Sequence, residues 1–226
     1  MIELLGISKH YGPVCALDSV SLTLPRGSTT VIHGPSGSGK TTLLRLIAGL
    51  ERPSEGQIHI RGELASTPAR VRPPQERNVG LVFQDAALWP HLSVAQNVAF
   101  GLLGQPRQEI DRRVGEMLSA MDLNGFEKRY PNQLSGGEAR RVAIARTLIV
   151  DPRYLLLDEP LTHLQPALKM RLLECIRHQA AARDVTLVYV SHDLEEARRL
   201  GGRKLKMVGG HVVSDTGLGC ASYDSV

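Results

Sequence analysis

Along most of this chain, short apolar runs alternate with segments in which apolar residues recur at helical spacing. Continuous apolar or β-branched runs occupy residues 29–33, 79–83, 154–157 and 185–190. Such runs are typical of parallel strands that are buried on both faces. Between them, apolar residues recur three or four positions apart, which predicts amphipathic helices. These stripes are Leu43, Leu44, Ile47 and Leu50; Ile110, Val114, Met117, Leu118 and Met121; Val142, Ala145 and Ile149; and Leu168, Leu172, Leu173 and Ile176. The pattern predicts an α/β fold with a mostly parallel sheet.

Two regions depart from this alternation. Residues 1–33 carry short, partly alternating apolar runs, broken at Gly12-Pro13 and at Pro25-Arg26-Gly27, so an antiparallel β subdomain is expected at the N-terminus. Residues 85–150 have a helical texture and predict a helical subdomain inserted between strands of the core. The whole chain, residues 1–226, is expected to form a single domain that carries these additions.

Three shorter segments complete the outline. Residues 57–60 alternate and predict a short strand. Residues 61–77 are polar and rich in Pro and Arg, so a loop with at most a short helix is expected there. The tail from Gly209 onward is polar and Gly-rich, and no further domain is expected in it.

Composition places the chain among soluble globular proteins. Of its 226 residues, 42% are hydrophobic and 22% are charged. No apolar run approaches the roughly 18 residues of a membrane span, and the N-terminus lacks the basic and apolar regions of a signal peptide. The expected location is therefore the cytoplasm. The three cysteines are scattered without metal-ligand spacing, so no disulfide framework is expected.

The net charge is mildly basic, at +4 with a pI of about 9.1. Such a balance could favour nucleic acid or an anionic membrane surface. Aromatic residues make up only 4% of the chain, however, and they show no pattern typical of RNA-binding domains. No nucleic acid partner is expected, and the basic excess is assigned to solvated helix faces.

The strongest chemical motif follows the first buried run. Its residues are Gly34, Pro35, Ser36, Gly37, Ser38, Gly39, Lys40 and Thr41, which match G-x-x-x-x-G-K-T. A strand, a Gly-rich turn and a helix in this order form a phosphate-binding loop, in which backbone N–H groups and the helix N-terminus favour an anion. Lys40 is expected to reach the outer phosphates, and the Thr41 hydroxyl is expected to bind Mg²⁺. The motif therefore predicts nucleotide binding.

Ionisable residues follow two later buried runs. Asp158 and Glu159 end the run at 154–157, and His192 lies two residues after the run at 185–190. In open α/β sheets, ligands bind beyond the carboxyl ends of the strands. Asp158 is thus predicted to hold Mg²⁺, and Glu159 to accept a proton from an attacking water. A lone histidine is more often structural, but at this edge His192 could contact a γ-phosphate.

A capping box predicts another helix start. Ser135 is followed three residues later by Glu138, the spacing of a reciprocal N-terminal cap. Gly136 and Gly137 lie in the first turn, where glycine is costly for a helix. That cost indicates a further requirement, such as close approach of the backbone to a ligand.

Together these motifs closely resemble the ATP-binding subunit of an ABC transporter, over nearly the whole chain. Residues 34–41 correspond to its Walker A motif, Gln84 to its Q-loop, residues 134–138 to its signature, residues 155–159 to its Walker B motif, and His192 to its switch histidine. From its local sequence alone, Tyr11 is expected to be a half-buried aromatic residue of a strand. The resemblance places it where the family stacks an aromatic ring on adenine.

The resemblance implies a dimer in which two copies enclose two ATP molecules head to tail. Each ATP would be held by residues 34–42, including Thr42, of one copy and by Ser135, Gly136 and Gly137 of the other. Thr41, Gln84 and Asp158 would organise Mg²⁺. Gln84, Glu159 and His192 would form the catalytic group, with Glu159 polarising the water and His192 sensing the γ-phosphate. Closure of the dimer would drive transmembrane permease subunits.

Residues 80–102 resemble the importer branch of the family. This implies a subunit that lies on the inner face of the cell membrane, with a solute-binding protein in the complex. The stretch around Trp89 and Pro90 would meet a cytoplasmic helix of the permease, although a core position for Trp89 is equally expected. An exporter or a lipid- or lipoprotein-extruding ATPase would share all of the chemistry. A soluble ABC protein acting on ribosomes or DNA is a third alternative. Such proteins usually have two nucleotide domains or long coiled coils, and this sequence shows neither pattern.

The sequence departs from the family pattern at two positions. Gln165 replaces an aspartate that helps to couple the two sites of the dimer, so communication across the dimer is expected to differ. Glu138 replaces a common glutamine and completes the capping box. Importers of this group often carry a C-terminal regulatory domain, which this chain is expected to lack.

Overall fold

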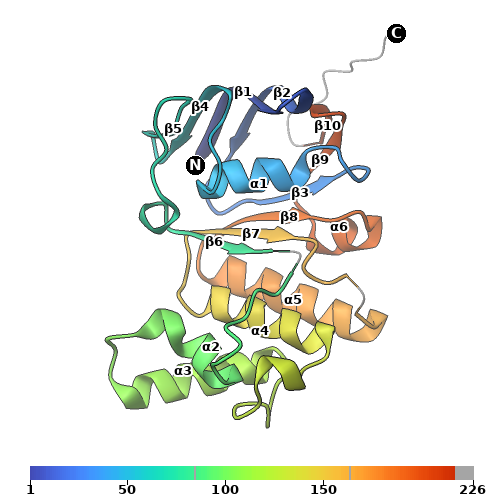
Figure 1. Cartoon of the computed structure of the whole chain (residues 1–226). Helices are drawn as coiled ribbons and strands as arrows, with labels where there is room; N and C mark the ends of the chain where they lie inside the picture. The colour runs from blue at the N-terminus through green and yellow to red at the C-terminus, as the bar shows by residue number, and fades with distance from the viewer. Residues whose placement is uncertain (84, 163, 217–226) are drawn as a thin grey trace.

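The structure is a computed structural model that describes residues 1–83, 85–162 and 164–216. One group of strands comprises β1 (Ile2–Tyr11), β2 (Val14–Leu24), β4 (Glu55–Ile60) and β5 (Glu63–Ser66). The other comprises β3 (Thr29–His33), β6 (Val79–Val82), β7 (Tyr154–Asp158), β8 (Thr186–Val190), β9 (Arg203–Val208) and β10 (His211–Asp215). The first group forms an antiparallel sheet in the order β2-β1-β4-β5, and the second a sheet in the order β10-β9-β3-β8-β7-β6 (Figure 1).

The six-stranded sheet is parallel except where β10 pairs with β9. The prediction of an α/β core with a mostly parallel sheet is therefore confirmed, as is the antiparallel β structure near the N-terminus. Because β3, β8 and β7 are neighbours and run in the same direction, the residues that follow these strands meet at one edge of the sheet.

Each central strand contributes side chains to two cores. Successive residues of a strand point to opposite faces of the sheet. Leu155 and Leu157 of β7 enter a core that is shared with the helical part of the chain, whereas Leu156 enters a core on the other face. In the same way, β8 sends Leu187 and Tyr189 to the first core and Val188 to the second. This double burial explains why these strands are apolar at every position.

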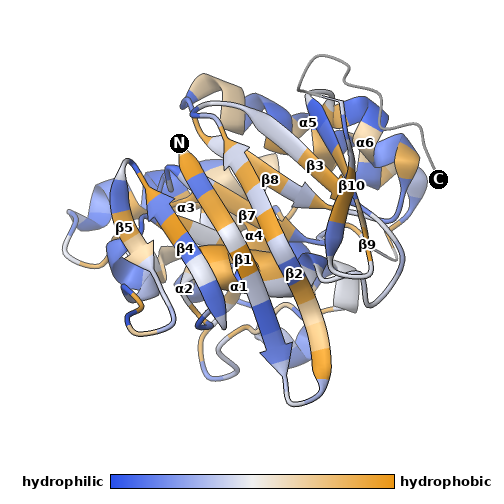
Figure 2. Cartoon of the chain, turned by 90° about the horizontal axis from the view of Figure 1, so that it is seen from above, coloured by the Kyte–Doolittle hydropathy of each residue, from blue (hydrophilic) through white to orange (hydrophobic). Residues whose placement is uncertain are grey.

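Helices cover both faces of the six-stranded sheet. Helix α1 (Lys40–Ala48) lies between the two sheets, and its buried leucines join the second core (Figure 1). Helices α4 (Gly136–Leu148) and α5 (Pro166–Ala182) pack on the opposite face, and α6 (Leu194–Leu200) lies beside α5. The antiparallel sheet is the outer layer over α1, and hydrophobic and hydrophilic residues are interspersed along its strands (Figure 2).

A buried arginine closes the C-terminal end of α1. The guanidinium of Arg77 donates to the carbonyls of Leu46 and Ile47 at 3.1 and 2.8 Å, and to Ser66 Oγ at 2.6 Å. These carbonyls belong to the last turn of α1, where the helix dipole favours a cation. Burial lowers the pKa of Arg77 to about 10. The side chain therefore remains charged at neutral pH and fixes the far end of the helix that begins at the phosphate-binding motif.

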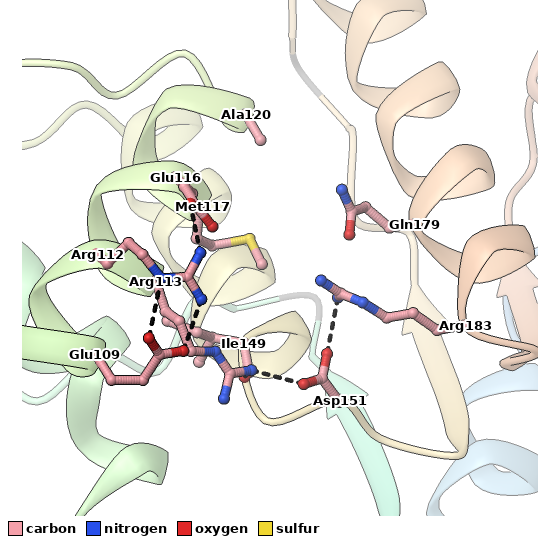
Figure 3. A pocket seen from close by; sticks show the side chains of 10 residues that line it. All are labelled: Glu109, Arg112, Arg113, Glu116, Met117, Ala120, Ile149, Asp151, Gln179 and Arg183. Carbon is pink, nitrogen blue, oxygen red and sulfur yellow. Dashed lines mark hydrogen bonds and ion pairs between the residues drawn. The ribbon is translucent and has the colours of Figure 1, made fainter. Parts of the chain in front are cut away.

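The helical segment lies between β6 and β7 in the chain. It contains α2 (Val94–Ala99), α3 (Arg107–Ala120) and α4, with short 3-10 turns at Phe100–Leu102 and Pro131–Gln133; another such turn, Pro74–Glu76, precedes β6. Asp151 joins this segment to the core, since its carboxylate pairs with Arg113 of α3 at 2.6 Å and with Arg183 after α5 at 2.9 Å (Figure 3). These residues line a cavity of about 330 Å³.

Three strands were not expected from the sequence. Residues 61–77 were predicted to be a loop, but Glu63–Ser66 forms β5 at the edge of the antiparallel sheet. No element was predicted for Arg203–Val208, which forms β9, or for His211–Asp215, which forms β10 against it. β5 and β10 are edge strands with exposed polar residues, so their apolar signal is weak. Within the described residues, no helix combines the length and apolar character needed to cross a membrane.

Candidate nucleotide-binding and catalytic site

The phosphate-binding motif occupies the turn between β3 and α1, as predicted. Gly39 is the residue before α1 and has φ of 94°, in the left-handed region that favours glycine. A Cβ atom at Gly39 would lie 2.4 Å from the carbonyl oxygen of Ala16, so no larger residue fits there. Pro35, Ser36 and Gly37 are exposed, whereas Ser38 is buried. The middle of the loop therefore faces solvent, whereas its C-terminal end is packed against the protein.

Lys40 bends back over this loop. Its ammonium donates to the carbonyls of Gly34 at 2.9 Å and Pro35 at 2.8 Å, and to Ser38 Oγ at 3.3 Å. Burial lowers the pKa of Lys40, and the neighbouring Glu159 and Asp158 act in the opposite direction. The ammonium thus lies between the exposed loop and two carboxylates that come from β7.

Thr41 and Asp158 form the oxygen-rich part of the site. Their side chains are hydrogen-bonded, although they come from α1 and from the end of β7. Both line a cavity of about 330 Å³ together with Phe83 and Asp85. Gln84, which was predicted to share in metal binding and catalysis, lies outside the described residues. A hydroxyl and a carboxylate side by side suit Mg²⁺, which prefers oxygen ligands.

Asp158 is a buried acid whose folded environment favours the protonated form. Burial raises its pKa above 3.8, the hydrogen bond from Thr41 opposes this, and the charge of Glu159 adds to it. A raised pKa means that the fold loses stability as pH rises above the ordinary aspartate range, because the carboxylate must then be charged while buried.

We expect Asp158→Asn to raise the thermal stability of the protein at pH 7 in EDTA. Removing the buried charge should stabilise the fold by about 1 kcal/mol, which for a chain of this size raises the melting temperature by roughly 2–4 °C. The gain should shrink as the pH falls through the raised pKa of the folded state and should be absent well below 3.8, where the aspartate is protonated in both the folded and the unfolded state. Calorimetry of both proteins across the pH range from 7 down to about 3 tests this, and a lower melting temperature of the variant at pH 7 would contradict it.

Glu159 and His192 meet across two neighbouring strands. Nδ1 of His192 lies 3.3 Å from Oε2 of Glu159. The main chain joins them as well, because the amide of Glu159 donates to the carbonyl of Val190 at 3.1 Å. The imidazole of His192 is largely exposed and the Glu159 carboxylate is mostly covered. A water molecule at this edge of the sheet could thus contact the Glu159 carboxylate, as a base, and the His192 imidazole at the same time.

Tyr11 lies beside the start of α1. Its hydroxyl contacts the carboxylate of Glu51 and the side chain of Thr42, and burial is the largest of the influences that raise its pKa. The ammonium of Lys9 lies 4.9 Å from the ring centroid. The residue is 43% exposed, so it retains surface on which a base can stack.

The predicted signature residues form the start of α4. Ser135 Oγ accepts from the amide of Glu138 at 3.3 Å, and the carboxylate of Glu138 accepts from the amide of Ser135 at 2.6 Å, so the capping box is confirmed. Ser135 and Gly136 are exposed. At Gly137 a Cβ atom would lie 2.6 Å from the end of the Leu164 side chain, which is flexible enough to move aside.

The structure does not bring this helix start to the phosphate-binding loop. Among the described residues, no hydrogen bond or ion pair links residues 135–137 to residues 34–42. A cluster behind His192 was not expected from the sequence; in it, Lys169 pairs with Glu196 and Asp193. Lys169 precedes Leu173 by four residues, so a charge on the apolar face of the predicted helix was the available signal.

Comparison with known protein families identifies the family of this chain. A sequence model described as "ABC transporter" matches residues 17–162, which include the phosphate-binding loop and the Asp158-Glu159 pair. The chain belongs to the ABC transporter family. The resemblance that the motifs predicted is therefore confirmed, and with it a P-loop fold of the ABC type.

Relatives and solved structures agree with this assignment. The chain is 45% identical over 214 residues to the "Fe(3+) ions import ATP-binding protein FbpC" of Escherichia coli strain K12, covering 94% of this chain and 60% of that protein. It is 46% identical over 217 residues to the "Sulfate/thiosulfate import ATP-binding protein CysA 1" of Agrobacterium fabrum, covering 93% of this chain and 62% of that protein. The chain thus spans about three fifths of the length of these ABC relatives.

Two solved ABC cassettes have the same fold. One is the dimeric post-hydrolysis structure of the ATP-binding cassette MJ0796 bound to ADP and Pi, with a TM-score of 0.87 and 32% identity over 96% of this chain and 99% of that one. The other is a further dimeric structure of the same bacterial ABC transporter cassette, with a TM-score of 0.88 and 33% identity over the same shares.

Proposed function

We propose that this chain is the ATP-binding and ATP-hydrolysing subunit that powers solute import by an ABC transporter. The observation that carries the proposal is the meeting of Lys40, the Thr41–Asp158 pair and the Glu159–His192 pair at one sheet edge. These groups come from three neighbouring parallel strands and supply a phosphate cradle, oxygen ligands and a base. The relatives that are named as import ATP-binding proteins support the direction of transport.

The residues of this site divide the work of phosphoryl transfer. The backbone of residues 34–39 and the N-terminus of α1 would bind the phosphates, and Lys40 would exchange its loop carbonyls for phosphate oxygens. Thr41 and Asp158, with Gln84, would hold Mg²⁺, which when bound neutralises charge on the phosphates. Glu159 would take a proton from the attacking water while His192 contacts the γ-phosphate. Tyr11 would stack on the adenine.

A second copy of the chain would complete each site. The first backbone N–H groups of a helix have no hydrogen-bond partners within that helix. In α4 these groups lie at the exposed N-terminal end of the helix, beside Ser135 and Gly136. Together with Gly137, they would face the ATP held by the partner copy. The dimeric state of the solved cassettes supports this arrangement.

Permease subunits would dock near Trp89. Its ring stacks on Phe100, with centroids 4.1 Å apart, and the guanidinium of Arg146 lies 4.6 Å from its centroid. Trp89 is half-buried, and Phe100 and Leu103 are exposed, so an apolar surface remains beside it. The protein would then lie on the inner face of the cell membrane, and a solute-binding protein would deliver the solute.

The purified protein is expected to hydrolyse ATP slowly with Mg²⁺ and to stop in EDTA. When it is co-expressed with the permease genes that neighbour its own gene, it should be recovered with the membrane fraction. A phosphate-release assay and fractionation on a sucrose gradient measure the two properties. Recovery with ribosomes would contradict a transport role, and a gene neighbourhood without a solute-binding protein would favour export.

A further inference from the structure

A buried ion-pair cluster lies directly behind the loop that carries His192. Glu196 of α6 is only 3% exposed. Its carboxylate accepts from the ammonium of Lys169 at 2.8 Å and from the hydroxyl of Tyr189 at 2.8 Å. It also accepts from the hydroxyl of Ser191 at 2.6 Å. Three donors from two separate parts of the chain, α5 and the end of β8, thus converge on one buried carboxylate, which keeps these parts in a fixed relation.

The same cluster holds both neighbours of His192. Ser191 donates to Glu196 through its hydroxyl, and that hydroxyl accepts from the amide of Asp193 at 2.9 Å. Asp193 accepts from Lys169 at 3.0 Å. The imidazole of His192 is largely exposed, so its position relative to Glu159 depends on the main chain at residues 191–193.

Lys169 connects this loop to the beginning of α5. It lies in the first turn of the helix, where its amide donates to the carbonyl of Gln165 at 2.9 Å. The segment just before α5 is held in turn by α4, because Arg140 donates to the carbonyl of Thr162. Contacts therefore join α4 to Thr162, and separately join α5, through Lys169, to the loop at 191–193.

The charges of Lys169 and Asp193 remain in place at neutral pH. Burial lowers the pKa of Lys169, but the hydrogen bonds to Glu196 and Asp193 outweigh it and the pKa is raised overall. Burial raises the pKa of Asp193, but hydrogen bonds from Lys169 and the Glu195 amide outweigh it and the pKa is lowered overall. Tyr189 has a pKa well above its ordinary range because it is buried beside Glu196, so it stays a donor.

We infer that Lys169, through Glu196 and Asp193, is the positioning residue that sets His192 against Glu159 and ties it to the start of α5. The inference rests on the proposed role of His192 in ATP hydrolysis. Lys169 lies four residues after Gln165, and its partly buried side chain links the start of α5 to the catalytic edge.

We expect Lys169→Met to lower kcat for ATP about ten- to a hundredfold with little change in KM, because His192 would lose its fixed position while the phosphate loop stays intact. Lys169→Arg, which keeps a cation that can donate to both carboxylates, should restore kcat to within about threefold of the native value. The matched control is Arg177→Met on the same helix, where the side chain is exposed and kcat should not change. Calorimetric melting curves identify the variants that are folded.

A double substitution separates positioning from a general loss of structure. On a His192→Ala background, Lys169→Met should lower the residual kcat by less than twofold, because the group that it positions is absent. An equal fold-loss on both backgrounds, or a folded Lys169→Met protein with native kcat, would overturn the inference. A His192→Ala protein with native kcat would instead overturn the proposed role of His192 itself.

Discussion

Replacing Glu159 with glutamine should lower the rate of ATP hydrolysis by about 10²–10⁴-fold, the contribution of a well-placed general base. Glutamine has the same shape and can still meet the imidazole of His192 at 3.3 Å, but it does not take up the proton of an attacking water. The residue sits at φ of 47°, a strained backbone position that an isosteric change leaves as it is.

ATP binding by the Glu159→Gln variant should remain within a factor of a few of the native protein. The proposed phosphate contacts would come from residues 34–39 and Lys40, whose ammonium is held by loop carbonyls and, within the described residues, makes no hydrogen bond to the Glu159 carboxylate. Equilibrium binding of a fluorescent ATP analogue and single-turnover hydrolysis measure the two properties. Glu174→Gln, an exposed acid on α5, serves as the control. Native turnover in the Glu159→Gln protein would show that another group is the base.

Ser135→Arg should abolish detectable ATP hydrolysis while ATP binding by the monomer stays near normal. Ser135 is exposed and caps α4, whereas the phosphate loop lies between β3 and α1, so the substitution should leave the proposed ATP contacts of its own chain unchanged. In a head-to-tail dimer it would place a bulky cation where the partner's ATP meets the start of α4. The loss of the cap costs a further 0.5–2 kcal/mol or so of local stability.

The helix α2 offers a matched control for the Ser135 variant. Ser93 caps α2 with the same reciprocal geometry, since its hydroxyl accepts from the amide of Gln96 and the Gln96 side chain accepts from the Ser93 amide. Ser93→Arg should therefore cost similar stability but leave hydrolysis by the purified protein intact. Equal losses of ATP binding and hydrolysis in the Ser135 variant would indicate that this helix start matters within its own chain.

Local motifs explain why much of the site could be predicted from the sequence. The phosphate loop needs only a strand, a glycine-rich turn and a helix that are contiguous in the chain, so residues 34–41 reveal it. The capping box at Ser135 and Glu138 is local for the same reason. The continuous apolar runs likewise identified the buried strands, because both faces of each strand are covered.

The edge strands β5 and β10 could not be predicted from local sequence patterns. Each is short, and each has mostly polar or exposed residues on one side, so its position beside a longer strand decides its conformation. Arg77 is a similar case, since its burial depends on the carbonyls at the end of α1 and on Ser66 of β5. Contacts between segments that are distant in sequence leave no periodic pattern.

The sequence by itself determined which groups this protein has for chemistry: a phosphate loop, two carboxylates after one strand and a histidine after another. Only the tertiary structure decided that Asp158 meets Thr41, that Glu159 meets His192 and that Lys169 lies behind them. The physical reason is the strand order, which places β3, β8 and β7 side by side although more than a hundred residues separate β3 from β7 in the chain. Side chains at strand ends become neighbours through hydrogen bonding between strands, and that pairing is set by the packing of the whole sheet.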